Sequence, residues 1–307
     1  MTLGSFGLRR RNYDFPPFRP PSEAESLLLR VTRGCPWNRC TFCSMYKDLK
    51  FEIREVEEVI HDIELAKELY GPGVRTVFLG DSNSLVVKTG SLIEILKSLY
   101  SSFPDVERVT SYGRAKTLVQ KPLEDLEKIR NAGLTRLHVG LETGDPELLR
   151  EIKKGATPDE MIEGGRKAKQ AGFEYSLYVL LGAGGEERWE QHARGTAEVL
   201  NQIDPHFIRV RTLIPQPHCP MYEEMLEGRF HPPGPETILK ETRLLLTELK
   251  VNSEFMSDHV SNLLPLHGRL PGAQGALVRR IDEALRDLEE DDGLRERMEA
   301  RRHLTNL

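Results

Sequence analysis

Three of the four cysteines lie close together in one short stretch, as Cys35, Cys40 and Cys43. Thiolate sulfur selects zinc or iron–sulfur clusters over hard cations such as magnesium. A structural zinc ion takes four protein ligands, so three cysteines would leave one coordination position open. They would equally leave one iron of a four-iron cluster without a protein ligand. The spacing alone therefore leaves zinc and an iron–sulfur cluster as alternatives, each with an open site for chemistry.

The length, composition and net charge of the chain disfavour several other classes of protein. The chain has 307 residues, of which 38% are hydrophobic and 30% charged, as expected of a soluble globular protein. Its 43 Lys and Arg against 48 Asp and Glu give a net charge of −5, which disfavours a nucleic-acid partner. The sequence has no apolar run that could span a membrane, and we expect no signal peptide. Crowded cysteines without a disulfide framework suit a reducing cytoplasm, where we expect the protein to lie.

Strands and helices must alternate to position the cysteine stretch. The apolar patterns predict strands at residues 27–32, 76–79, 108–112, 137–141, 175–181 and 207–213. They predict helices at residues 56–70, 92–99, 122–132, 145–153, 158–171 and 189–203. Repeated βα units build a parallel sheet, either open or curled into a partial barrel, with function at the carboxyl ends of the strands. The cysteines directly follow the first strand, so they belong at that rim.

Both flanks differ from this core. Residues 1–26 are proline-rich and are predicted to form an extended arm, because proline disfavours helices and central strands. Residues 27–215 form the predicted core, and residues 216–307 a mostly helical extension packed on it. Within the extension we expect helices at residues 238–249 and 277–288, and a loop at residues 256–271. We predict that residues 255–262, which include Asp258 and His259, help to close the substrate pocket, with a solvated loop as the alternative.

Five segments together resemble the radical S-adenosylmethionine (SAM) superfamily. The resemblance covers about residues 22–225 and is strongest to the branch of oxygen-independent coproporphyrinogen oxidase and the methylthiotransferases. The commonest family spacing is Cys-x3-Cys-x2-Cys, whereas this chain has one residue more before Cys40. The segments are Thr32-Arg33-Gly34-Cys35, Cys40-Thr41-Phe42-Cys43, Val139-Gly140-Leu141-Glu142-Thr143-Gly144, Leu181-Gly182-Ala183-Gly184-Gly185-Glu186 with His192, and Pro217-His218-Cys219-Pro220-Met221-Tyr222-Glu223.

The resemblance implies a fold, two cofactors and a reaction. The fold would be α/β, a partial (β/α)6 TIM-type barrel with a mostly helical C-terminal extension. Cys35, Cys40 and Cys43 would bind a 4Fe–4S cluster, whose open iron would bind SAM. Reductive cleavage of SAM would give a 5′-deoxyadenosyl radical that abstracts hydrogen from a substrate. The protein supplies placement and exclusion of competing reactions.

The resemblance also implies contacts to SAM. Phe42 would pack on adenine, with a loop-packing role as the alternative. Gly80 and Asp81 stand where relatives carry Gly-Gly-Glu and would meet the methionine amino group, although Asp81 could equally be a turn residue. Glu142 would be a polar SAM contact at the rim, and Gly182 would let backbone approach adenine, unless its loop simply needs a positive φ.

Four further positions have less definite roles. Lys154 aligns loosely with a basic residue that pairs with the SAM carboxylate, but we expect a solvated lysine at a helix end. Arg209 and Arg211 share one face of their strand and would meet an anionic group if that face is the barrel interior. Cys219 could supply a fourth metal ligand, but we expect it to be a buried thiol.

These inferences predict a radical SAM enzyme that acts on a small or medium-sized metabolite. A second cysteine cluster for an auxiliary centre is missing from the sequence, which disfavours sulfur insertion. We also expect an electron donor such as flavodoxin or ferredoxin, and no membrane partner. The alternatives are a tRNA- or peptide-modifying radical SAM enzyme, or a zinc-stabilised binding protein; iron content would separate the last from the others.

Overall fold

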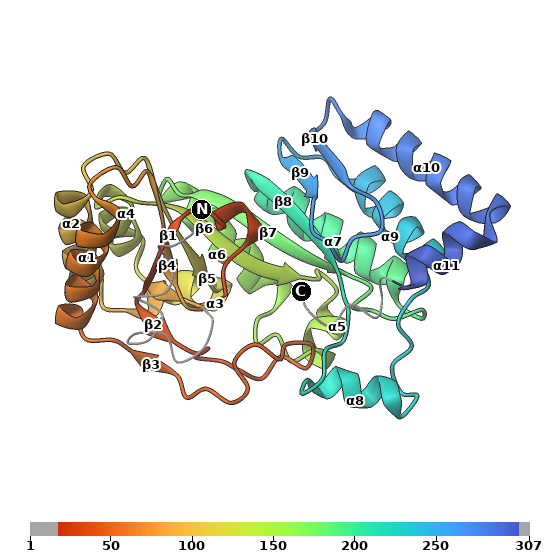
Figure 1. The fold of residues 1–307 in the computed structure, drawn as a ribbon. Helices are drawn as coiled ribbons and strands as arrows, with labels where there is room; N and C mark the ends of the chain where they lie inside the picture. The colour runs from red at the N-terminus through yellow and green to blue at the C-terminus, as the bar shows by residue number, and fades with distance from the viewer. Residues whose placement is uncertain (1–17, 301–307) are drawn as a thin grey trace.

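The computed structural model describes residues 18–300, which build a main sheet of eight strands with helices along it and a small separate sheet of two strands (Figure 1). The strand order is β1-β4-β5-β6-β7-β8-β9-β10, and every neighbouring pair is parallel except β9 with β10. The strands are β1 (Leu27–Arg30), β4 (Thr76–Gly80), β5 (Arg108–Gly113), β6 (Leu134–Glu142), β7 (Glu174–Leu181), β8 (Phe207–Thr212), β9 (Glu254–Ser257) and β10 (Leu266–Arg269).

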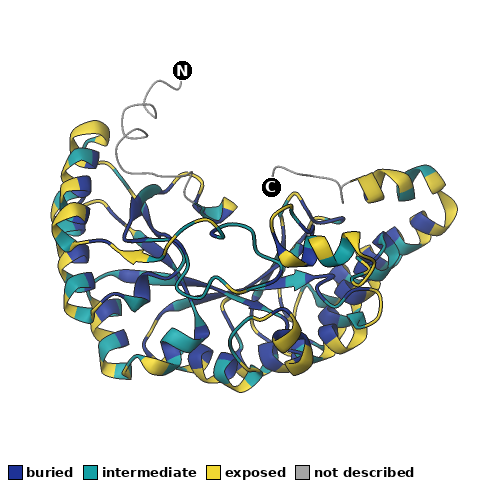
Figure 2. Ribbon diagram, turned by 90° about the horizontal axis from the view of Figure 1, so that it is seen from below, coloured by how far each residue is buried: buried dark blue, intermediate teal, exposed yellow. Residues whose placement is uncertain are grey.

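Long helices follow the strands and lie on the outer side of the curved sheet (Figure 2). They are α1 (Val56–Tyr70), α2 (Thr89–Ser102), α4 (Leu123–Asn131), α6 (Pro158–Gln170), α7 (Trp189–Ile203) and α9 (Pro235–Glu248). Within residues 18–300 the edge strands β1 and β10 do not pair with each other, so the barrel stays open. The predicted fold class, a partial TIM-type barrel built from six parallel βα units, is confirmed.

Local sequence explains where these helices begin and end. In α1, Val59, Ile63 and Ala66 are buried at helical spacing, and Gly71 ends the helix at a φ of 67°. Helix α6 begins with a capping box, in which Thr157 accepts the backbone N–H of Glu160 and the Glu160 side chain accepts that of Thr157. The helices are therefore specified locally as well as by packing.

The two faces of the sheet differ in chemistry. Residues such as Val77, Val109 and Val139 point outward and form the main apolar core with the helices. Their strand neighbours point to the inner face, where the rings of Phe78, Tyr112, His138 and Tyr178 lie 5.1 to 6.3 Å apart in a row across four strands. Alternation along each strand thus produces a dry outer layer and a polar, aromatic inner layer.

Glu23, in the short helix η2 (Pro21–Glu23), seals the inner layer near the amino ends of the strands. Its fully buried carboxylate accepts hydrogen bonds from Ser26 at 2.7 Å and Arg108 at 3.2 Å, and lies 3.4 Å from His138 Nε2. Burial alone would raise the pKa of Glu23, but these hydrogen bonds outweigh it and bring the pKa down to about 2. The rest of the predicted arm, residues 1–17, lies outside the described residues.

The C-terminal extension contains a hairpin that we did not predict. We expected a loop at residues 256–271, but β9 and β10 lie within 254–269 and extend the sheet. The sequence prediction is wrong here because the strands owe their form to a distant partner, β8, and not to local periodicity. The other strands and α-helices that we did not predict are β2 (Thr32–Arg33), β3 (Glu52–Ile53), α3 (Ala115–Gln120), α8 (Pro220–Leu226) and α11 (Asp292–Ala300). The remaining helix of the extension, α10 (Gln274–Glu290), was expected.

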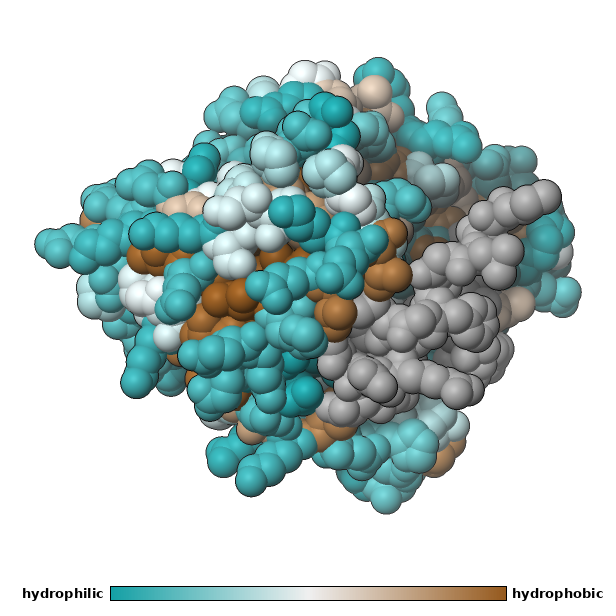
Figure 3. Space-filling view, turned by 60° about the vertical axis from the view of Figure 1, so that its left-hand side comes forward, coloured by the Kyte–Doolittle hydropathy of each residue, from teal (hydrophilic) through white to brown (hydrophobic). Residues whose placement is uncertain are grey.

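The surface is mainly hydrophilic. Figure 3 shows polar side chains over most of one face around a smaller apolar stretch. Among the described residues, the exposed large hydrophobic side chains are Ile53, Leu69, Tyr70, Leu226 and Val260. No helix within this part of the chain has the length and apolar character needed to cross a membrane.

Candidate active site

The three cysteines of the N-terminal stretch gather in the loop after β2. All three are free thiols of intermediate exposure. Burial raises the pKa of Cys40 and raises that of Cys43 to about 11. The negative charge of neighbouring cysteines raises both pKa values further. The positive charge of Lys154 acts against this rise at both cysteines, and Arg114 does so at Cys40. The thiols therefore lie together beside two cations that favour the thiolate form.

Contacts from distant segments hold the cysteine loop in place. Trp37 Nε1 donates to the Lys153 carbonyl at 2.7 Å, and a side chain at Gly155, whose φ is 74°, would collide with the Trp37 ring. The Asn38 side chain donates to the Tyr46 carbonyl at 2.5 Å. Lys47 donates to the carbonyl of Cys40 at 3.0 Å. The loop is thus tied to the segment that follows α5 (Pro146–Glu151) as well as to itself.

The donor set fits a cluster. No three His, Cys, Asp or Glu side chains within residues 18–300 are arranged to hold one metal ion. A single zinc ion would need its sulfurs about 3.8 Å apart around a tetrahedral centre, whereas each thiolate of a 4Fe–4S cluster binds a different iron. Three free thiols beside Lys154 and Arg114 suit an anionic iron–sulfur group.

Glu142 and Lys154 form a buried ion pair next to these thiols. Lys154 Nζ donates to Glu142 Oε1 at 2.7 Å, and the two side chains are only 15% and 13% exposed. Glu142 has a φ of 64°, where the register of β6 with β7 shifts after Gly140. A side chain at Gly140 would collide with the carboxylate of Glu142 and lie 2.7 Å from Lys154 Nζ. The pair therefore depends on a glycine and on a strained backbone, as often occurs at functional sites.

Lys154 does not have the exposed position that we expected. It packs beside the site, with Nζ 5.9 Å from the centre of the Phe42 ring. Burial alone would lower the pKa of Lys154, but the negative charges of Glu142 and Cys40 outweigh it, so the pKa is raised and the side chain stays protonated. The solvated interpretation is wrong because Gly140 leaves space for this ion pair. That glycine, two residues before a rim carboxylate, is the sequence signal that could have indicated it.

Asp81 lies at the base of the cysteine loop, fully buried. Its Oδ2 is 3.1 Å from Arg30 and accepts the backbone N–H of Gly34 at 3.3 Å, while Oδ1 has no hydrogen-bond partner in the described part of the chain. Burial raises the pKa of Asp81, and Arg30 opposes that rise. One oxygen thus positions the loop, and the other is available to accept a hydrogen bond. A side chain at the adjacent Gly80 would only touch Leu28, so packing within the chain does not require a glycine there. Contact of Gly80 and Asp81 with SAM stays a prediction.

Phe42 belongs to a small apolar cluster that is separate from the main core. The other members of the cluster come from α5, the ends of β7 and β8, and the segment around α8; they are Leu148, Ile152, Leu180, Ala183, Leu213, Cys219, Met221, Tyr222 and Phe230. Phe42 is partly exposed, and an aromatic ring on such a surface could pack against adenine. Cys219 is 1% exposed within this cluster, which confirms the predicted buried thiol.

Gly182 faces the C-terminal extension. Its N–H donates to both carboxylate oxygens of Glu241, at 3.0 and 3.2 Å, and a side chain at this position, where φ is 79°, would lie 2.8 Å from Ile238. Glu241 is fully buried, and burial raises its pKa to about 8. Its Oε1 also lies 3.1 Å from Nδ1 of the buried His192. The glycine is therefore explained by packing, and its approach to adenine remains a prediction.

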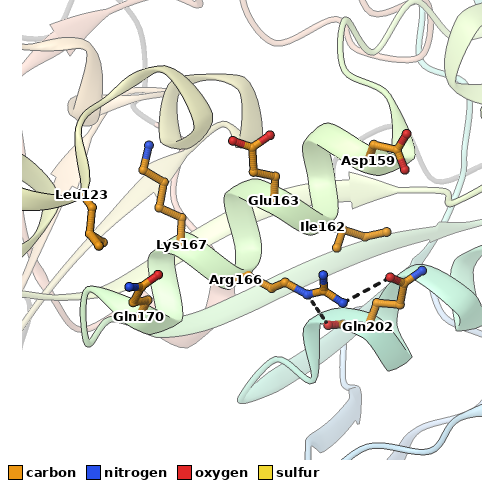
Figure 4. A pocket seen from close by; sticks show the side chains of 8 residues that line it. All are labelled: Leu123, Asp159, Ile162, Glu163, Arg166, Lys167, Gln170 and Gln202. Carbon is orange, nitrogen blue, oxygen red and sulfur yellow. Dashed lines mark hydrogen bonds between the residues drawn. The ribbon is translucent and has the colours of Figure 1, made fainter.

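A surface pocket of about 560 Å³ lies away from this site. Figure 4 shows its side chains, most of them on α6, with Arg166 donating to the carbonyl and side-chain oxygens of Gln202. It opens on the outer helical layer and includes none of the predicted site residues. We assign it no role in the reaction.

A model of the Radical SAM superfamily matches residues 29–194. The match covers more than half of the sequence, so this chain belongs to the radical SAM superfamily. Enzymes of this superfamily use a 4Fe–4S cluster and SAM, so the predicted enzyme class and cofactors are confirmed for the family. Relatives of both coproporphyrinogen-oxidase and methylthiotransferase type match, so the predicted branch is also confirmed.

Individual relatives are distant. An uncharacterised methyltransferase of Pyrococcus horikoshii is 27% identical over 201 residues, which cover 64% of this chain and 41% of that protein. The heme chaperone HemW of Bacillus subtilis is 20% identical over 220 residues, covering 69% and 57%. Coproporphyrinogen III oxidase (HemN) of Escherichia coli shares the fold, with a TM-score of 0.58 and 18% identity over 73% of this chain and 52% of that one. This chain thus spans about half the length of the curated relatives that it matches.

Proposed function

We propose that this chain is a radical SAM enzyme that abstracts hydrogen from a small or medium-sized metabolite. Cys35, Cys40 and Cys43 hold the 4Fe–4S cluster, and SAM lies beside Phe42 and Glu142. When bound and reduced, the cluster and SAM supply a 5′-deoxyadenosyl radical that removes a hydrogen atom from the substrate. The observation that carries this proposal is the gathering of three free thiols beside the buried Glu142–Lys154 pair at the carboxyl ends of the strands.

The chain's own residues have distinct roles in this proposal. Lys154 and Arg114 offset negative charge on the thiolates and cluster, and Lys154 has further N–H groups to donate to the SAM carboxylate. Glu142 keeps Lys154 oriented and can accept from a ligand hydroxyl. The apolar cluster around Phe42 provides a dry surface for a flat base. The polar inner face of the barrel is left for the substrate.

A small substrate and a separate electron donor complete the proposal. The only cysteine outside the loop is Cys219, which is buried, so the sequence offers no ligands for a second cluster. Together with the net charge of −5, this favours a metabolite over tRNA. We propose flavodoxin or ferredoxin as the donor, because the cluster must be reduced from outside. A tRNA- or peptide-modifying reaction is the alternative substrate class.

The test is anaerobic purification followed by reduction in the presence of SAM. We expect about four irons per chain and slow formation of 5′-deoxyadenosine and methionine even without substrate. Stoichiometric zinc in place of iron would refute the proposal. Adding a ferredoxin or flavodoxin with its reductase in place of a chemical reductant tests the proposed donor. Metabolite profiling with the active enzyme then separates the substrate classes.

A further inference from the structure

The inner face of the barrel carries two arginines with different partners. Arg209 and Arg211 alternate in β8 with Ile208 and Val210, which are buried in the outer core. The side chain of Arg209 is 7% exposed and lies 3.2 Å from Asp258 at the end of β9. The structure thus places the arginine pair of β8 on the inner face, and one of the two is neutralised by the chain itself.

Arg211 has no such partner. Its guanidinium carbon lies 5.0 Å from the centre of the Tyr178 ring, and no carboxylate within residues 18–300 contacts it. Arg136 provides a direct contrast, because it lies 4.7 Å from the centre of the Phe207 ring and also pairs with Glu174 at 2.8 Å. A guanidinium stacked on a ring keeps the N–H groups at its edge available for an anion. Arg211 is therefore held in position by the Tyr178 ring, and its N–H groups are available to bind an anion.

His259 offers a second unused donor nearby. Its Nδ1 accepts the backbone N–H of Ser261 at 3.2 Å, so a neutral ring carries its proton on Nε2. Burial and the charge of Arg211 lower the pKa of His259 to about 4, which keeps the ring neutral. Within the described residues Nε2 has no hydrogen-bond partner.

Asn262 ties the segment that carries His259 to β8 on both sides of Arg211. Its side-chain oxygen accepts the N–H of Thr212 at 2.8 Å, and its side-chain amide donates to the carbonyl of Val210 at 2.8 Å. These two residues flank Arg211 in β8. The segment that carries His259 is therefore bound to the strand at the position of Arg211, as expected of a prepared site.

We propose that Arg211 and His259 bind an anionic oxygen group of the substrate, a carboxylate or a phosphate. That the bound anion belongs to the substrate rests on the proposed function, whereas the anion site itself does not. Arg211 provides charge and two N–H groups in one plane, and His259 provides a single neutral donor from the side. The register pairs Arg211 with Leu180 near the carboxyl end of β7, so the anion would lie at the same rim as Glu142.

The test measures anion binding by the anaerobically purified protein with its cluster. Benzoate and inorganic phosphate are titrated separately in a calorimeter, so the two arms distinguish a carboxylate from a phosphate. The variants are Arg211→Gln, His259→Ala and, as a matched control, Arg136→Gln. In a second measurement phenylglyoxal modifies arginines, and peptide mass spectrometry follows the rates at positions 211 and 136 with and without each anion.

We expect saturable binding of at least one anion by the wild type. Arg211→Gln should weaken it about tenfold or more, because charge-assisted hydrogen bonds are lost, and His259→Ala should weaken it less. Arg136→Gln should bind as the wild type does, and anions should slow modification at Arg211 only. Binding that is equal in Arg211→Gln and wild type, or undetectable binding of both anions, overturns the inference. Iron content and SAM cleavage of the wild type report separately on the proposed function.

Discussion

The carboxyl group of Glu241 binds the backbone N–H of Gly182 with both oxygens, at 3.0 and 3.2 Å. Glu241 lies in α9 and Gly182 in the turn after β7, so this contact joins the C-terminal extension to the rim of the barrel. Nδ1 of His192, from α7, lies 3.1 Å from the same carboxyl group. His192 Nε2 donates to the Leu180 carbonyl at 3.1 Å. Nδ1 itself has no hydrogen-bond partner among the described residues, so the hydrogen bonds of Glu241 that hold this junction are those from Gly182.

Replacing Glu241 tests this contact. Glu241→Ala leaves the buried Gly182 N–H without an acceptor and should lower the free energy of unfolding by about 1–3 kcal/mol, with more lost to the cavity. Glu241→Gln keeps both the size of the side chain and an oxygen that can accept from Gly182, so it should lose much less. Denaturant unfolding of both variants measures the difference. Equal losses in the two variants would contradict this account, because glutamine keeps the size of the side chain and an acceptor for Gly182.

Glu241 and His192 should also make the stability of the protein depend on pH. The pKa of Glu241 is raised to about 8, so between about pH 4.5 and 8 the folded chain keeps a proton that the unfolded chain has released. Stability from this group is therefore complete at low pH and is lost as pH rises through 8. His192, with a pKa lowered to about 4, acts in the opposite sense below about pH 6.5.

We therefore expect the stability of the wild type to fall from pH 6.5 to 8.5, where His192 no longer titrates. Glu241→Gln should remove most of that fall, because the amide does not ionise. Thermal unfolding across this window compares the two proteins. Parallel curves for both would mean that Glu241 is already ionised in the folded chain.

Gly140 provides a test of the Glu142–Lys154 pair. A methyl group at position 140 would displace both side chains, so Gly140→Ala should weaken SAM binding about tenfold while the iron content stays near that of the wild type. Gly73→Ala is the control, because nothing lies within 4 Å of a side chain at that position. Equilibrium binding of SAM and iron analysis give the readouts. Joint loss of iron and SAM in Gly140→Ala would instead make the pair part of the cluster site.

The cysteines make a further prediction. Changing Cys35, Cys40 or Cys43 to Ala should each abolish the brown colour of the anaerobic protein, because every thiolate binds its own iron. Cys219→Ala should keep the colour, since that thiol lies in an apolar cluster. Absorption near 400 nm and iron content check all four. A colourless Cys219→Ala protein that is still folded would add a fourth ligand.

Much of the fold was predictable because it is specified locally. The helices at 56–70 and 189–203 have the predicted bounds, since their apolar spacing and their ends agree. The hairpin of β9 and β10 was missed because its strands depend on pairing with β8. The site was predictable where cysteine spacing matters, but Lys154 was not, since its burial depends on Gly140 and on the turn at Glu142. The sequence puts Arg209 and Arg211 on one face of β8, but only the structure shows which face of that strand points inward.

Glu23 and Glu241 limit how far this chain could be truncated or exchanged as a module. The superfamily match covers residues 29–194, yet one buried carboxylate before it and one after it bind groups inside it. A chain cut to the matched segment would leave Arg108 and the Gly182 N–H without these partners. The unit that sequence comparison delimits is thus smaller than the unit that folds. Fusion, truncation or domain exchange should keep the two flanking glutamates with the core that they complete.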